Sequence, residues 1–140
     1  MTAREFLNQY KEADRIARRL RAEYERELEL IDAIKSTSDI DGLPRGKQLS
    51  KVVEDRAVRL ADKAAEWKIA ELDALHQRQV VFDMVSKISG RPGEVLYLRH
   101  VKCLTWKEVC AEVPMSWPAL RPYYQEGLRI VEQKLQESTT

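Results

Sequence analysis

The stretch LYLRHVKCLTWKEVCAEVPMSWPAL, residues 96–120, decides the fold of the C-terminal part of this chain. Its apolar residues have the spacing of a helix-turn-helix, with a short helix, a tight connection and a second helix. The two helices of that motif cross steeply on a tiny core, and one face of the second stays free. Cys110 occupies the small-residue position where the helices cross closely. The residues expected to pack are Val109, Cys110, Val113, Met115, Leu120 and Tyr123.

Capping signals mark where the two helices of this motif begin. Thr105 and Glu108 form a Thr-x-x-Glu capping box at the start of the first helix. Ser116 is placed as the N-cap of the second helix. The sequence therefore predicts helices over residues 106–112 and 117–136. A further apolar pattern predicts a helix over residues 92–102, which completes a three-helix module.

Two long helices are predicted before this module, over residues 3–35 and 49–88. Apolar residues recur in the first at alternating steps of four and three, which is a heptad seam. Glycine and proline between residues 36 and 47 forbid a continuous helix, so the two long helices should lie antiparallel. The first seam consists of Phe6, Tyr10, Ala13, Ala17, Leu20, Tyr24, Ile31 and Ile34, with Glu27 at the one missing position.

The second long helix carries a seam spaced by seven residues. Its members are Val53, Leu60, Trp67, Ala74, Val81 and Ile88. Ala57, Ala64 and Val85 are expected at the intervening positions, and Glu71 and Arg78 are expected to interrupt them. Three apolar residues lie off this line, which predicts a second contact, with the C-terminal module or with another subunit. They are Leu72, Leu75 and Phe82.

The expected fold is all-α. A long antiparallel, coiled-coil-like helical hairpin over residues 1–89 would serve as an oligomerisation or partner-binding arm. A helix-turn-helix domain over residues 90–140 would follow it. Gly90 suits the C-cap of the second long helix, and Pro92 suits the first turn of the next.

Composition agrees with a helical protein and sets limits on its function. Of the 140 residues 44% are apolar and 34% are charged, and glycine and proline are scarce. There is no apolar run long enough to span a membrane and no apolar signal core, so we expect a cytoplasmic protein with reduced cysteines. The net charge of +1 means that DNA binding would depend on a local basic patch.

The chain resembles a known family in two places. Residues 96–128, LYLRHVKCLTWKEVCAEVPMSWPALRPYYQEGL, resemble region 4 of sigma-70-type factors. The segments MTAREFLNQYKEADRIARRL and VEDRAVRLAD are similar to small phage and prophage proteins grouped with late-transcription regulators of the ArpU and RinA type. The residues that carry the resemblance are Leu96, Arg99, Thr105, Trp106, Glu108, Val109, Ser116 and Leu128. It implies a phage or prophage transcriptional regulator in a bacterial host, which binds double-stranded promoter or operator DNA. The hairpin of such a regulator would mediate self-association or contact with bacterial RNA polymerase.

Three prolines depart from the family pattern. Pro114 stands where the tight turn usually has a small or flexible residue. Pro118 is tolerable in a first helical turn, but Pro122 would remove a backbone hydrogen bond and clash with the preceding turn, at about 3 kcal/mol. Either the recognition helix is kinked, or it begins near Pro122 after an irregular lead-in.

The free face of the second helix is expected to contact DNA. Arg121 matches guanine O6 and N7, and Gln125 matches adenine N6 and N7. Ser116 and Trp117 lie at the helix start, where hydroxyl and N–H groups meet phosphate. The alternative is that Arg121 and Gln125 are ordinary surface residues of a protein-binding helix. Further phosphate contacts from the flanking helices are expected from Arg99, Lys102 and Lys107.

Metal binding and catalysis are not expected. His100 and Cys103 are three residues apart, but His76 and Cys110 are the only other soft ligands, and zinc needs three or four. No orienting triad accompanies either cysteine, and no phosphate-cradling glycine loop is present. We therefore expect no cofactor and no enzymatic activity.

Three functions stay open at this stage. The first is a DNA-binding regulator, acting as a homodimer because paired DNA sites need paired modules. The second is a small terminase-like DNA-packaging subunit, which would form a ring. The third is a helical module that binds RNA polymerase, a sigma factor or a host protein without reading DNA.

Overall fold

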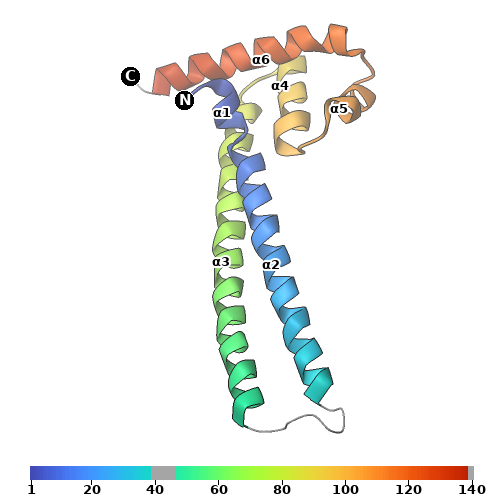
Figure 1. The fold of residues 1–140 in the computed structure, drawn as a ribbon. Coiled ribbons are helices and arrows are strands. Elements are labelled where there is room, and N and C mark those ends of the chain that lie inside the picture. Colours follow the sequence, from blue (N-terminus) through green and yellow to red (C-terminus); the bar gives the residue numbers. More distant parts are fainter. Residues whose placement is uncertain (39–46, 139–140) are drawn as a thin grey trace. The chain divides into compact units, whose positions relative to one another are not determined.

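The computed structural model describes residues 1–38 and 47–138, and all regular structure in these ranges is helical (Figure 1). The expected all-α fold is therefore confirmed. The N-terminal part consists of α1 (Ala3–Leu7), α2 (Gln9–Ser38) and α3 (Lys47–Ser86). The C-terminal part consists of α4 (Gly90–Leu96), the π-helical segment η1 (Tyr97–Val101), α5 (Trp106–Glu112) and α6 (Trp117–Ser138).

The chain forms two compact units, each described by itself. Residues 1–13 and 73–140 make up one, here called the C-terminal unit, and residues 14–72 make up the other, the hairpin unit. This division differs from the boundary expected between residues 89 and 90. Ala3 and Leu7 of α1 and Val81 and Val85 of α3 are buried in one core with the C-terminal helices. The seam of α3 looks uniform in the sequence, so it does not reveal where its packing partners change.

In the hairpin unit α2 and α3 lie antiparallel, as expected (Figure 1). Glu23 of α2 pairs with Lys63 of α3 at 3.8 Å, whereas Glu27 pairs with the earlier residue Arg56 at 3.2 Å. Tyr24 stacks on Trp67 with 5.4 Å between ring centroids. The loop expected between these helices falls mostly on residues 39–46, which lie outside the described residues.

The intervening seam positions of α3 agree only in part with those expected. Val85 is buried and Ala64 is partly buried, as expected, and the expected interruptions Glu71 and Arg78 are exposed. Ala57 is exposed, however, whereas the preceding residue Arg56 is partly buried and paired with Glu27 of α2. At that position the step along the seam is therefore three residues and not four.

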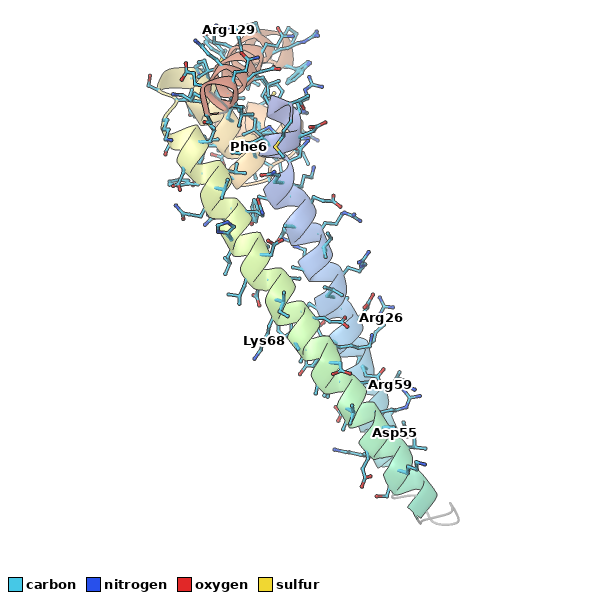
Figure 2. The ribbon with its side chains drawn as sticks, turned by 90° about the vertical axis from the view of Figure 1, so that its left-hand side faces the viewer. Phe6, Arg26, Asp55, Arg59, Lys68 and Arg129 are labelled. Carbon is cyan, nitrogen blue, oxygen red and sulfur yellow. The ribbon has the colours of Figure 1, made fainter. Side chains whose placement is uncertain are left out.

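The position missing from the first seam is occupied by an ion pair. Glu27 is only 8% exposed, and its carboxylate accepts a hydrogen bond from the partly buried Arg56 at 3.2 Å. A buried pair of this kind adds little net stability, because desolvation offsets the attraction. Its geometry does require Glu27 to lie opposite Arg56, so the pair favours one register of the hairpin. Figure 2 shows Arg26, Arg59 and Lys68 projecting outward from the same two helices.

The single first helix expected over residues 3–35 is divided at Asn8, between α1 and α2. The Asn8 N–H donates to the Arg4 carbonyl at 2.9 Å, and the Asn8 carbonyl accepts from Glu12 N–H at 3.0 Å. A capping box starts α1, with the Thr2 hydroxyl bound to Glu5 N–H and the Glu5 carboxylate bound to Thr2 N–H. This second Thr-x-x-Glu pattern was missed in the sequence.

The core of the C-terminal unit contains the residues expected from the helix-turn-helix spacing, with one exception. Val109, Val113 and Leu120 are fully buried, and Cys110 and Met115 are partly buried. Tyr123 was expected in this core but is exposed, and Tyr124 is buried in its place. The buried face of α6 steps from residue 120 to 124, 127 and 131, so residue 123 lies off that line.

The connection from α3 to α4 also differs in detail. The second long helix ends at Ser86, so Gly90 is not its C-cap. Instead Gly90 opens α4 with a positive φ of 78°, after Ser89 at the N-cap position. Pro92 lies in the first turn of α4, as expected. A Cβ atom on Gly93 would overlap the carbonyl group of Ile88, so this connection is tightly packed.

Candidate nucleic-acid interface

The first helix of the motif begins as its sequence predicts. The Thr105 hydroxyl accepts a hydrogen bond from Glu108 N–H at 3.3 Å, and the Glu108 carboxylate accepts one from Thr105 N–H at 3.3 Å. This reciprocal capping box satisfies two backbone donors that would otherwise have no partner. It fixes the start of α5 at Trp106.

Pro114 is accommodated in the turn between α5 and α6. Val113, the C-cap of α5, is extended, with φ −101° and ψ 102°, as a residue before proline prefers. Met115 N–H donates to the Val113 carbonyl, which closes a three-residue turn centred on Pro114. The fixed φ of proline suits the centre of such a turn. The turn therefore uses proline where a flexible residue was expected.

The second helix begins at Trp117 and not near Pro122. The Ser116 carbonyl accepts from Ala119 and Leu120 N–H groups at 3.1 and 3.0 Å, so Ser116 occupies the N-cap position. Pro122 lies inside α6. Having no N–H, it leaves the carbonyl of Pro118 without its helical donor, but Pro118 is exposed and water can replace the bond.

Trp117, Arg121 and Gln125 form an exposed stripe on α6, each one turn from the next. Leu120 and Tyr124, on the same helix, are buried. Ser116, Lys102 and Lys107 are exposed as well. The free face expected of the second helix is therefore present.

A pocket of about 300 Å³ in the C-terminal unit brings four of the seven expected DNA contacts together. These four are Arg99, Trp117, Arg121 and Gln125. The other three, Ser116, Lys102 and Lys107, are not among the residues that line it. Five further lining residues were not expected from the sequence: Arg4, Asn8, His100, Trp106 and Tyr124.

Arg99 is held at the pocket wall by two contacts. Its guanidinium donates to the Leu104 carbonyl at 2.8 Å, and its central carbon lies 4.8 Å from the centroid of the Trp106 ring. Trp106 in turn packs against Trp117 and Tyr124, with centroid distances of 4.6 Å in both cases. Arg99 therefore braces the segment before α5, in addition to presenting charge to the pocket.

The π-helical segment η1 explains why Arg99 and His100 reach this pocket. The sequence predicted one regular helix over residues 92–102, but Lys102 N–H donates to the Tyr97 carbonyl, five residues back, at 3.0 Å. Cys103 then takes a positive φ of 57°, which ends the helix. Insertions of this type are common at functional sites, and no apolar spacing in the sequence signals them.

His100 is a buried polar residue, 4% exposed, whose Nε2 lies 3.1 Å from the Tyr124 hydroxyl. Burial, assisted by the positive charges of Arg99 and Lys11, lowers the pKa of His100 to about 4. Burial likewise raises the pKa of the Tyr124 phenol. Both groups are therefore neutral at pH 7, and they link η1 to α6 by a hydrogen bond.

This burial predicts that acid destabilises the protein. In the unfolded chain His100 takes up a proton near pH 6.5, but in the folded chain only near pH 4. Because the unfolded state binds more protons between these values, the free energy of unfolding should fall as pH drops from 6.5 to 4. The loss should be at most about 3 kcal/mol.

The measurement is urea unfolding at several pH values on the protein and two variants. His100→Gln, which keeps a hydrogen-bonding group but does not titrate, should remove this part of the pH dependence. His76→Gln, at an exposed histidine, should retain it. An identical pH dependence in His100→Gln and the unchanged protein would contradict the assignment.

A metal site is not indicated in the part of the chain that the structure describes. His100 is bound to Tyr124, and the Cys103 thiol donates to the His100 carbonyl at 3.7 Å. Within residues 1–38 and 47–138, no three His, Cys, Asp or Glu side chains lie close enough to hold a metal ion. In the same ranges no helix is sufficiently long and apolar to cross a membrane.

Comparison with protein-family models, with curated proteins and with solved structures gives no match to this chain. Functional assignment therefore depends on the geometry of the C-terminal unit and on the resemblance seen in its sequence.

The residues that sequence reasoning missed share a cause. Arg4 of α1 and Asn8, which follows α1, are exposed and lie far from η1 in the sequence. They join the pocket only because Leu7 is buried in the same core. The one available signal was the Thr2–Glu5 capping box, which indicates an ordered N-terminus. The sequence offers a role for His100 only as a metal ligand, since its partner Tyr124 is distant in the sequence.

Proposed function

We propose that this protein is a phage or prophage transcriptional regulator of the ArpU and RinA type, which binds promoter or operator DNA through α5 and α6. The observation that carries the proposal is the exposed stripe of Trp117, Arg121 and Gln125 on α6. A helix presented in this way fits the major groove, where arginine pairs with guanine and glutamine with adenine. The resemblance of residues 96–128 to sigma-70 region 4 also supports the placement of α6 in the major groove.

The charge around this stripe supports contact with DNA despite a net charge of only +1. Arg4, Arg99 and Arg121 line one pocket beside it, and no carboxylate is among the described residues of that lining. Some charges elsewhere are paired locally, such as Arg21 with Glu25 at 3.1 Å. The three arginines of this pocket therefore provide a local basic patch, which is what a near-neutral DNA-binding protein needs.

Arg121→Ala should weaken specific DNA binding by about 1–3 kcal/mol and relax the base preference at one position. The side chain is exposed, so its removal should leave the fold intact. Binding to a labelled duplex is measured by fluorescence anisotropy, with each base of the site varied in turn.

The matched control is Arg26→Ala, which removes the same charge from an exposed residue of the hairpin unit (Figure 2). This variant should bind as the unchanged protein does. If Arg121→Ala has the affinity and base preference of Arg26→Ala, then α6 does not read bases through Arg121.

A role of the hairpin in self-association is proposed from an apolar stripe on α3. Val58, Ala61, Ala65, Ile69 and Leu72 are all exposed in the hairpin unit. Their spacing places them on one face of the helix, away from Trp67 and Arg56, which contact α2. A second copy of the chain could cover this face, giving the homodimer that paired DNA sites require. Sedimentation equilibrium distinguishes a dimer from a packaging ring or a monomer.

A further inference from the structure

The pocket beside α6 has features that a base-reading helix does not require. Its walls come from the N-terminal helices, which supply Arg4 and Asn8, as well as from η1, α5 and α6. Of these, Arg4 and Asn8 lie outside the helix-turn-helix altogether. The pocket therefore extends beyond the base-reading face of α6, and both the N-terminal and the C-terminal parts of the chain form it.

We propose that this pocket binds one nucleotide unit, with its phosphate at Arg4 and its base against Trp117. Guanidinium groups bind phosphate through paired N–H donors, and the amide group of Asn8 supplies a further polar contact. Where DNA supplies the nucleotide, the inference rests on the proposed function. Where a free nucleotide supplies it, the inference stands alone.

Charge favours an anion in this pocket. Arg4, Arg99 and Arg121 line it, and the described lining residues include no carboxylate to neutralise them. Glu5 follows Arg4 in the sequence, but its carboxylate is bound to the Thr2 N–H at 3.1 Å in the capping box. Three cations without a facing anion indicate a ligand that carries negative charge.

The volume of the pocket and its aromatic lining residues favour a nucleotide as the ligand. The volume of about 300 Å³ is at the lower end for small-molecule sites and suits a single phosphate with one ring system. Trp106 is enclosed by Arg99, Tyr124 and Trp117, so it serves as a support. Trp117 is exposed, and its ring remains able to stack on a base.

The experiment follows the indole N–H signals of the full-length protein by NMR. The probes are sodium phosphate, deoxyadenosine monophosphate, deoxyadenosine without phosphate, and a short DNA duplex, all at matched ionic strength. We expect the signals of Trp106 and Trp117 to shift with phosphate-bearing probes. The signal of Trp67, in the hairpin unit, provides an internal reference and should not move.

Arg4→Gln should weaken binding of the phosphate-bearing probes about tenfold and reduce the salt slope of duplex binding by about one. Arg26→Gln, a matched change on the hairpin, should alter neither. Arg4→Lys keeps the charge without the paired donors and should give an intermediate loss. It therefore supplies a second measurement should Arg4→Gln fail to fold.

The outcomes separate the two sources of phosphate. Loss of mononucleotide binding in Arg4→Gln supports a free nucleotide as the ligand, whereas loss of duplex binding alone supports a backbone phosphate of DNA. Equal binding of every probe by the Arg4 and Arg26 variants would overturn the proposal. That result would leave base reading by Arg121 untouched, since the latter is measured by base preference.

Discussion

Replacement of Leu7 with alanine is expected to destabilise the C-terminal unit by about 2–5 kcal/mol, although Leu7 lies at the opposite end of the sequence. Leu7 is fully buried, in one cluster with Val95, Leu96 and Leu120. Its truncation removes buried apolar surface and leaves a cavity that the surrounding helices fill only in part. The capped helix α1 holds the side chain there, so little relaxation is available.

Hydrogen exchange of backbone amides measures this effect helix by helix. In Leu7→Ala the amides of α5 and α6 should lose protection together with those of α1. The control is Leu30→Ala, at a leucine that is 48% exposed in the hairpin unit, which should change stability by less than about 0.5 kcal/mol. Unchanged protection of α5 and α6 in Leu7→Ala would show that the N-terminus does not belong to their core.

Gly93→Ala is expected to lower the free energy of unfolding by about 3 kcal/mol or more. This is at or above the upper end of the range that is usual for overpacking. The added Cβ would overlap the carbonyl oxygen of Ile88, which is backbone and cannot rotate away. Relief requires α4 to move from the end of α3, yet Val95 and Leu96 of α4 are fully buried. The substitution should therefore loosen the whole C-terminal unit.

Thermal and urea unfolding of Gly93→Ala measure this cost. Glu94→Ala is the neighbouring control, because Glu94 is exposed and its pair with Arg91 at 3.3 Å lies at the surface. Exposed pairs contribute about 0–1 kcal/mol, so this variant should unfold close to the unchanged protein. A stability of Gly93→Ala equal to that of Glu94→Ala would mean that α4 does not pack on Ile88.

Much of the fold could be predicted from local signals. The capping box of Thr105 and Glu108 placed the start of α5 correctly, and the bounds of that helix agree with those expected. The position of Ser116 likewise placed the start of α6. Such signals act within a few residues, and they determine helix ends because unpaired N–H groups are costly.

What depends on contacts between distant segments could not be predicted. The seam of α3 fits steps of three or four after each seven-spaced residue, and only the partner helix shows that Arg56 and not Ala57 faces it. Arg56 is charged and only partly buried, so a pattern of apolar residues cannot identify it as the residue that faces α2. In the same way nothing in the sequence connects Leu7 with Leu120.

Only the part of the candidate site that lies on a single helix could be predicted from the sequence. Arg121, Gln125 and Trp117 were found because they lie on one helix, where spacing alone determines the face. Arg4 and Asn8 join them through the tertiary packing of α1, and His100 joins them through the irregular segment η1. Neither feature has a periodic signature.

The most direct test of the proposed function is selection of binding sites from a random pool of duplex DNA, carried out at two salt concentrations. Contacts with phosphate alone weaken steeply as salt rises and carry no sequence information, whereas contacts with bases persist. We predict an enriched motif that is retained at the higher salt concentration and is altered at one position by Arg121→Ala. Failure to enrich any motif, with all binding lost as salt increases, would contradict the assignment of α6 as a recognition helix.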